Sequence, residues 1–418
     1  MSDSLGNDRR SQNRSVGNME RQLLELLFEE NSGGVTQGPA RVLSAALAER
    51  AIQWGLAPAL LQRLSERDEA LPAEVNKCVE SYVLMTRVRT LQLVSRGAMA
   101  LGALNEAGVN AVCFKGFARY AETGMLPFRS MGDVDLLVTP NALDRAIKIL
   151  EDVGFRLDIP GPIEDYQAFI HSAPHFSGNR AVALVDEDSN SIDLHWGFGQ
   201  MCGPALQPER IVERSVQVEA CGQAIRHVGR LDNLLLSAHH VLRENFTPSS
   251  ITKSLLDIHE LVRGDDEPLE ERIFKEAGMP NVALVACQHI LRKFSGQDQR
   301  AGTEARLSRL LDAADRRQAE NLAAVFELQV DSRSVNRDVL HLLHGASLRE
   351  LLRTAFLNSG RNRRFMEAIG EVPDRNRFAR FLWDLLRVGR RDLLLYRSLA
   401  RAKRPLRSRE VNALGQRV

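Results

Sequence analysis

Two aspartates, Asp133 and Asp135, are separated by a single residue just before the apolar run of residues 136–138. In a β-strand alternate side chains point to the same face, so both carboxylates would project together while the apolar residues enter a core. Neighbouring carboxylates repel each other and lose hydration when they are buried. A divalent cation offsets both costs, and Mg²⁺ binds carboxylate oxygens together with substrate phosphates. The pair therefore indicates metal-assisted chemistry on a nucleotide.

A third carboxylate, Asp193, lies on the predicted strand of residues 191–196. If this strand lies near the strand of Asp133 in a mixed sheet, three carboxylates meet, and Asp193 is then either a metal ligand or the base that takes a proton from an attacking hydroxyl. His195 shares a face with Asp193 and either contacts phosphate or acceptor or packs as a core histidine.

Candidate phosphate-binding residues precede the aspartates. Lys115 and Gly116 close a short apolar strand at residues 111–114 and lead into a predicted short helix. Glycine lets the backbone approach a phosphate closely, the free N–H groups of a helix N-terminus favour anions, and Lys115 adds a positive charge. Arg129 either pins its loop to a carboxylate or reaches a phosphate; we expect the phosphate, because a guanidinium matches paired oxygens.

These motifs together resemble those of the uncharacterised branch of the polymerase-beta-like nucleotidyltransferase superfamily. The resemblance covers about residues 80 to 265. It rests on Phe114-Lys115-Gly116, Arg129, Met131-Gly132, Asp133-Val134-Asp135-Leu136-Leu137-Val138 and Asp193-Leu194-His195-Trp196.

The resemblance implies an α/β (α+β) fold, in which a small mixed-sheet nucleotidyltransferase core is flanked by N-terminal and C-terminal helical regions. It also implies Mg²⁺-dependent (or Mn²⁺-dependent) transfer of a nucleotidyl group from a nucleoside triphosphate, with ATP expected, to a hydroxyl of a protein, sugar or small molecule. The wider superfamily usually has Gly followed by Gly or Ser where this chain has Gly116-Phe117, so no serine hydroxyl contacts the phosphate there. The expected catalytic and metal-binding residues are Asp133, Asp135 and Asp193, and the expected substrate-binding residues are Lys115, Gly116, Arg129 and His195.

The main alternative is a catalytically inactive interaction or scaffold protein built on the same fold, for which the helical half from about residue 230 to 418 is suited. The three retained carboxylates argue against it, because an inactive copy has no metal to offset their repulsion. A polymerase or tRNA-modifying enzyme predicts a basic groove, which a net charge of +1 does not favour.

Composition points to an ordinary soluble protein of two or three domains, since 418 residues exceed what one core usually serves. The five cysteines show no CxxC spacing, which argues against a zinc site or a disulfide framework. No transmembrane segment is predicted, and the expected compartment is the cytoplasm. The predicted organisation is a disordered tail (1–19), a helical region (20–108), the core (109–230), a helical region packed on the core (231–300) and a helical C-terminal region with a basic tail (301–418).

Four further expectations concern particular segments. The apolar residues from Leu84 to Leu104 step by three or four, which predicts one buried face along a helix. The acidic turn of residues 186–188 is interpreted as a solvated hairpin tip. The stretch from Arg375 to Val418 holds thirteen basic residues against three acidic ones, and a solvated helix face is favoured over contact with nucleic acid, an acidic partner or a membrane. Further helical segments are predicted at about 268–293, 303–328, 338–357 and 376–403.

Overall fold

The computed structural model describes most of the chain up to residue 330. The predicted helices at 338–357 and 376–403 and the basic stretch from Arg375 lie outside the described residues, as does nearly all of the predicted N-terminal tail. No helix in the described part is long and apolar enough to cross a membrane. The described ranges are 19–29, 43–67, 69–158, 179–199, 201–244, 246–263, 270–295 and 301–330.

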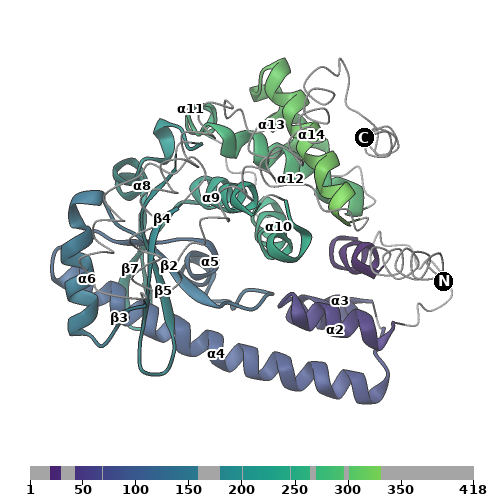
Figure 1. The fold of residues 1–418 in the computed structure, drawn as a ribbon, viewed down its shortest axis with the longest axis horizontal. Helices are drawn as coiled ribbons and strands as arrows, with labels where there is room; N and C mark the ends of the chain where they lie inside the picture. The colour runs from purple at the N-terminus through teal and green to yellow at the C-terminus, as the bar shows by residue number, and fades with distance from the viewer. Residues whose placement is uncertain are drawn as a thin grey trace, which may run out of the picture.

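A mixed sheet of seven strands forms the centre of the molecule, in the order β3-β4-β5-β2-β1-β7-β6 (Figure 1). The pairs β2–β5 and β1–β7 are parallel, and the other neighbours are antiparallel. The predicted α/β class with a mixed sheet is therefore confirmed. The strands are β1 (Val112–Cys113), β2 (Asp133–Leu137), β3 (Arg156–Leu157), β4 (Asn179–Val185), β5 (Ser191–Phe198), β6 (Val216–Ala220) and β7 (Gln223–His227).

Helices cover both faces of this sheet. The long helix α4 (Ala73–Glu106) packs against α6 (Leu143–Asp152), and α5 (Lys115–Thr123) packs against α9 (Arg230–Arg243) (Figure 1). The helix α4 approaches the sheet closely at Gly97, where an added Cβ would lie 3.0 Å from the Val134 side chain. Val134 and its face thus belong to the core, and the opposite face of β2 carries the aspartates.

The prediction of one buried face along residues 84–104 is wrong for the first half of that segment. Leu84 is 65% exposed, and Val88 and Leu91 are each 49% exposed, whereas the face is buried from Val94 onward. The reason is length: α4 has 34 residues and extends beyond the sheet. Its N-terminal half packs on α2 and α3 through a different face, which includes the buried Val79.

The N-terminal helices form a small layer beside α4. Residues 19–28 are helical, so the last residue of the predicted tail already belongs to a helix. The helices α2 (Ala45–Gln53) and α3 (Ala57–Glu66) follow, and the turn between them contains Gly55 at φ +68°. A left-handed backbone of this kind favours glycine, because a side chain there is strained.

Five more helices follow α9 in the part of the chain that the structure describes. The predicted segment 268–293 divides at Gly278, which has φ +78° and where an added Cβ would lie 2.7 Å from the backbone nitrogen of Gly203. The predicted segment 303–328 divides at Asp312, whose carboxylate accepts hydrogen bonds of 2.8 Å from Ala314 N and Asp315 N and so caps the second helix. The helices are α10 (Pro248–Arg263), α11 (Glu271–Glu276), α12 (Met279–Ser295), α13 (Ala301–Leu310) and α14 (Ala313–Val330).

The turn between β4 and β5 is not simply a solvated tip. Asp186 is only 2% exposed, and its carboxylate accepts hydrogen bonds from the backbone of Asp188 and Asn190 and from the Asn190 amide. Arg96 of α4 donates to it at 2.7 Å. This carboxylate therefore fixes the hairpin and ties it to α4, which corrects the interpretation of that residue as solvated.

Candidate active site

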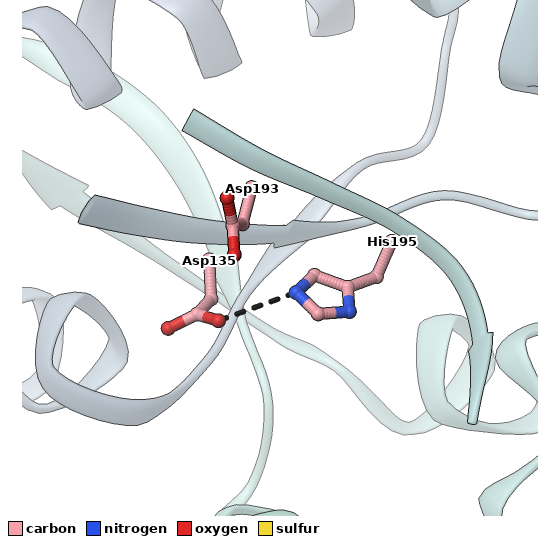
Figure 2. Close-up of side chains that lie close together, drawn as sticks. All are labelled: Asp135, Asp193 and His195. Atoms are coloured by element: carbon pink, nitrogen blue, oxygen red, sulfur yellow. Dashed lines mark hydrogen bonds and ion pairs between the residues drawn. The ribbon is translucent and has the colours of Figure 1, made fainter. Parts of the chain in front are cut away.

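The parallel register of β2 and β5 brings the predicted carboxylates together. Asp135 is paired with Asp193, and Leu137 with His195. Ligand atoms of Asp135, Asp193 and His195 all lie within 4.8 Å of one another. Figure 2 shows the three side chains projecting from the neighbouring strands into one space. Asp133 precedes Asp135 by two residues on the same face, so the acidic cluster, defined as Asp133, Asp135 and Asp193, extends along β2.

Asp135 is held by two partners. Lys115 Nζ donates to Asp135 Oδ1 at 2.6 Å, and His195 Nε2 lies 3.2 Å from the same oxygen (Figure 2). Burial alone would raise the pKa of Asp135, but the Lys115 charge and the His195 hydrogen bond outweigh it, so the pKa lies below its ordinary value. Asp135 is therefore ionised, and its second carboxylate oxygen is left for another cation.

The environment of Asp133 and Asp193 differs from that of Asp135. Neither Asp133 nor Asp193 makes a hydrogen bond or ion pair with the described part of the chain, and both are half-buried. Burial, reinforced by the charges of Asp133 and Asp135, raises the pKa of Asp193 to about 7. Burial followed by repulsion from Asp135 also raises the pKa of Asp133. The nearby positive charges thus only partly offset these effects, and no described residue forms an ion pair with either group.

This donor set fits a hard divalent cation. Carboxylate oxygens are the ligands that Mg²⁺ prefers, and two of the three carboxylates have no other partner among the described residues. A bound cation would also remove the repulsion that raises their pKa values. Asp193 and the free oxygen of Asp135 are the residues best placed to hold it, with Asp133 at the edge of the cluster.

The turn that carries Lys115 has a strained backbone. Lys115 lies at φ +54°, a left-handed conformation that is uncommon for a residue with a side chain. Asn233 of α9 holds this turn through both of its amide atoms: Lys115 N donates to Asn233 Oδ1 at 2.7 Å, and Asn233 Nδ2 donates to Lys115 O at 3.3 Å. The sequence analysis did not identify Asn233. Strain held in this way at a charged residue beside carboxylates is typical of functional sites.

The side chain of His195 is buried next to the acidic cluster and is not accessible to a substrate. It is fully buried, and its ring contacts Phe114 edge-on and stacks on Phe198. Burial lowers its pKa, so the neutral ring donates its Nε2–H to the ionised Asp135. Of the two alternatives for His195, the structure favours the packed core histidine over contact with phosphate or acceptor. The buried ring orients the Asp135 carboxylate.

Arg129 binds a carboxylate of its own protein and not an open site. Its Nε and Nη2 atoms donate to Asp257 of α10 at 2.7 to 3.0 Å, and both side chains are largely buried. The expected phosphate contact is thus corrected in favour of the alternative, in which Arg129 pins its loop. Gly116 serves the same packing: an added Cβ would lie 3.1 Å from Arg129 Nη2 and 3.3 Å from the Met131 sulfur.

A lysine that the sequence analysis did not single out also lies beside the cluster. Lys253 is on α10, one turn before Asp257, and interacts electrostatically with Asp133. No local signal marks Lys253, Asn233 or Asp257 in the sequence, because each lies on a helix whose pattern only indicates packing. Their distance in sequence from β2 hides their proximity in space.

Comparison with protein families gives one match. A family model described as an uncharacterised nucleotidyltransferase matches residues 44–292, which is more than half of the 418 residues. The matched range contains the whole sheet, the acidic cluster, Lys115, Asn233 and Asp257. Comparison with curated proteins and with solved structures finds no match.

Proposed function

The chain belongs to the uncharacterised nucleotidyltransferase family, and we propose that it transfers a nucleotidyl group from a nucleoside triphosphate to an acceptor hydroxyl with the help of Mg²⁺ or Mn²⁺. The observation that carries this proposal is the register of β2 against β5, which pairs Asp135 with Asp193 on the face that also bears Asp133. Three carboxylates close together on adjacent parallel strands repel one another and destabilise the fold unless a bound cation neutralises them.

The proposed roles follow from the environment of each carboxylate. When bound, a divalent cation would offset the carboxylate charges and the negative charge on the transferred phosphate. Asp135 is the fixed member of the set, because Lys115 and His195 hold one of its oxygens. Asp193 is the free member, and it is half-buried without a hydrogen bond from the described residues.

Asp193 also suits the proton transfer that the reaction requires. The acceptor hydroxyl gives its proton to the Asp193 carboxylate as its oxygen forms a bond to the α-phosphorus, and the bond from phosphorus to the leaving pyrophosphate breaks. A base must have a carboxylate oxygen available, and neither oxygen of Asp193 is engaged in a hydrogen bond or ion pair with the described residues.

Lys115 is proposed as the link between the carboxylates and the substrate. In the structure its ammonium neutralises Asp135 at 2.6 Å. Binding of a cation and a triphosphate would supply Asp135 with another positive charge and Lys115 with another anion, so the ammonium can turn to a phosphate oxygen without leaving either group uncompensated. Asn233 keeps the backbone of Lys115 in place during this exchange.

A labelling experiment tests the proposal. The purified full-length chain is incubated with each of the four α-³²P-labelled nucleoside triphosphates, Mg²⁺ or Mn²⁺ and a cell extract. We expect labelled phosphorus to be transferred to an extract component by the wild type and not by Asp193→Asn. Asp186→Asn, which alters a buried carboxylate outside the site, is the matched control and should retain transfer.

The same experiment separates the enzyme from a scaffold. A catalytically inactive relative would transfer no label from any nucleotide with either cation. Transfer that is equal for the wild type and Asp193→Asn would instead assign the activity to a contaminant or to another part of the chain. Either result would refute the proposed function.

A further inference from the structure

Lys253 is a half-buried lysine with no direct ion-pair partner among the described residues. Its ammonium makes no hydrogen bond or ion pair with the described residues, although α10 is well packed around it. The neighbouring cations differ in this respect: Lys115 is paired with Asp135, and Arg129 is paired with Asp257. An ammonium that is partly removed from water without an anion is costly, so an anion that is missing from the chain itself would be stabilising there.

The side chain of Lys253 is seated against the turn between α2 and α3. A Cβ on Gly55 would lie 2.7 Å from Lys253 Cε and 2.9 Å from Lys253 Nζ. The same point lies 2.0 Å from the Ser130 hydroxyl oxygen, so the ammonium and the hydroxyl occupy one small space that a side chain on Gly55 would fill. A backbone hydrogen bond of 2.9 Å from Ser130 N to Gly55 O fixes the two segments together.

This space lies close enough to the acidic cluster for Lys253 to interact electrostatically with Asp133. The charged groups that act on Lys253 are Arg129, Asp133 and Asp257, and Arg129 and Asp257 already satisfy each other. Asp133 is the first residue of β2 and is the more exposed of its two aspartates, since every later residue of the strand is buried. Lys253 therefore acts on the more exposed of the two aspartates of β2.

We propose that Lys253 and Ser130 bind the phosphate tail of the nucleoside triphosphate, the part that leaves as pyrophosphate. The ammonium and the hydroxyl would each donate a hydrogen bond to oxygens of the β- or γ-phosphate, while the α-phosphate lies at Asp135 and Asp193. This inference rests on the proposed function. It adds that the N-terminal helices are part of the site, because Gly55 shapes the space in which both donors lie.

Affinity measurements with the wild type and Lys253→Met test the assignment independently of catalysis. Calorimetric titrations of the full-length chain with ATP, AMP and inorganic pyrophosphate are made in the presence of Mg²⁺. The loss of a charge-assisted hydrogen bond corresponds to a decrease in affinity of about 10-fold to 100-fold. We expect this loss for ATP and pyrophosphate and an unchanged affinity for AMP, which has no β- or γ-phosphate.

Two other variants sharpen the experiment. Lys148→Met removes a positive charge from the exposed face of α6 and should leave all affinities unchanged, which controls for net charge. Gly55→Ala places a methyl group in the space between Ser130 and Lys253, so it should weaken ATP and pyrophosphate binding while AMP binding is retained.

The outcomes distinguish this inference from the proposed function. If the wild type binds neither ATP nor pyrophosphate, both fail. If the wild type binds ATP and Lys253→Met binds it equally well, only the assignment of Lys253 fails. A structural role, in which Lys253 supports Asp133 alone, would lower the melting temperature of Lys253→Met and weaken ATP and AMP binding alike, and this result would also overturn the assignment.

Discussion

The substitution Asp193→Asn should make the metal-free protein more stable at pH 8, although it removes a residue of the proposed site. Asp193 lies opposite Asp135 and near Asp133, and burial together with these charges raises its pKa from 3.8 to about 7. Between about pH 4 and pH 7 the folded protein thus holds a proton that the unfolded chain has already lost. The metal-free fold is therefore fully stabilised by this proton below about pH 4 and loses that contribution as the pH rises to about 7.

The size of the stability difference follows from the pKa shift of Asp193. Three pKa units at about 1.4 kcal/mol each give a ceiling of about 4 kcal/mol, and the partial exposure of the carboxyl reduces the expected gain to about 2 kcal/mol. Asparagine has nearly the same shape and cannot ionise, so it avoids the repulsion. We expect Asp193→Asn to be more stable than the wild type by about this amount at pH 8 and equal to it near pH 4.

Urea denaturation in the presence of EDTA measures the difference at both pH values. Asp158→Asn, at an exposed aspartate outside the cluster, is the control and should match the wild type. Addition of Mg²⁺ at pH 8 should stabilise the wild type and leave the variant unchanged, because binding to the folded state alone raises stability. A variant that is less stable than the wild type at pH 8 would refute the argument that the cluster carries uncompensated charge.

Three further substitutions test other contacts. Arg129→Met should lower the free energy of unfolding in urea by about 3 to 5 kcal/mol, because the buried Asp257 loses its partner; a loss below about 1 kcal/mol would contradict this pairing. Asn233→Leu should cost about 2 kcal/mol and also weaken Mg²⁺-ATP binding in calorimetry, because Lys115 is no longer held; full affinity would show that the clamp does not serve the site. Asp186→Asn should cost about 2 kcal/mol in thermal denaturation with nucleotide affinity unchanged, and weakened binding would show that this hairpin is coupled to the site.

Local pattern in the sequence was enough to predict the strands that carry the carboxylates. Asp133 and Asp135 alternate with apolar residues, and Asp193 lies on a strand with the same period, so their faces follow from strand geometry. Their meeting also required the two strands to be neighbours. In a mixed sheet these two strands can be neighbours, and the parallel pairing of β2 with β5 shows that they are.

The contacts made by the helices could not be predicted from the sequence. Arg129 and Asp257 are 128 residues apart, and Lys115 and Asn233 are 118 residues apart, so nothing local links them. The apolar stripe of α4 shows a related limit: its period indicates a helix, but which residues are covered depends on where the sheet ends. Patterns predict the face of an element, whereas tertiary packing decides what that face meets.

Binding of Mn²⁺ in the presence of ATP, followed by the electron paramagnetic resonance signal of the free ion, tests the central claim most directly. The account predicts that the wild type takes up the ion and that Asp135→Asn and Asp193→Asn each weaken its binding by more than about ten-fold, while Asp186→Asn binds as the wild type does. Equal uptake by all four proteins, or no uptake by the wild type, would contradict the assignment of a divalent metal site to these strands.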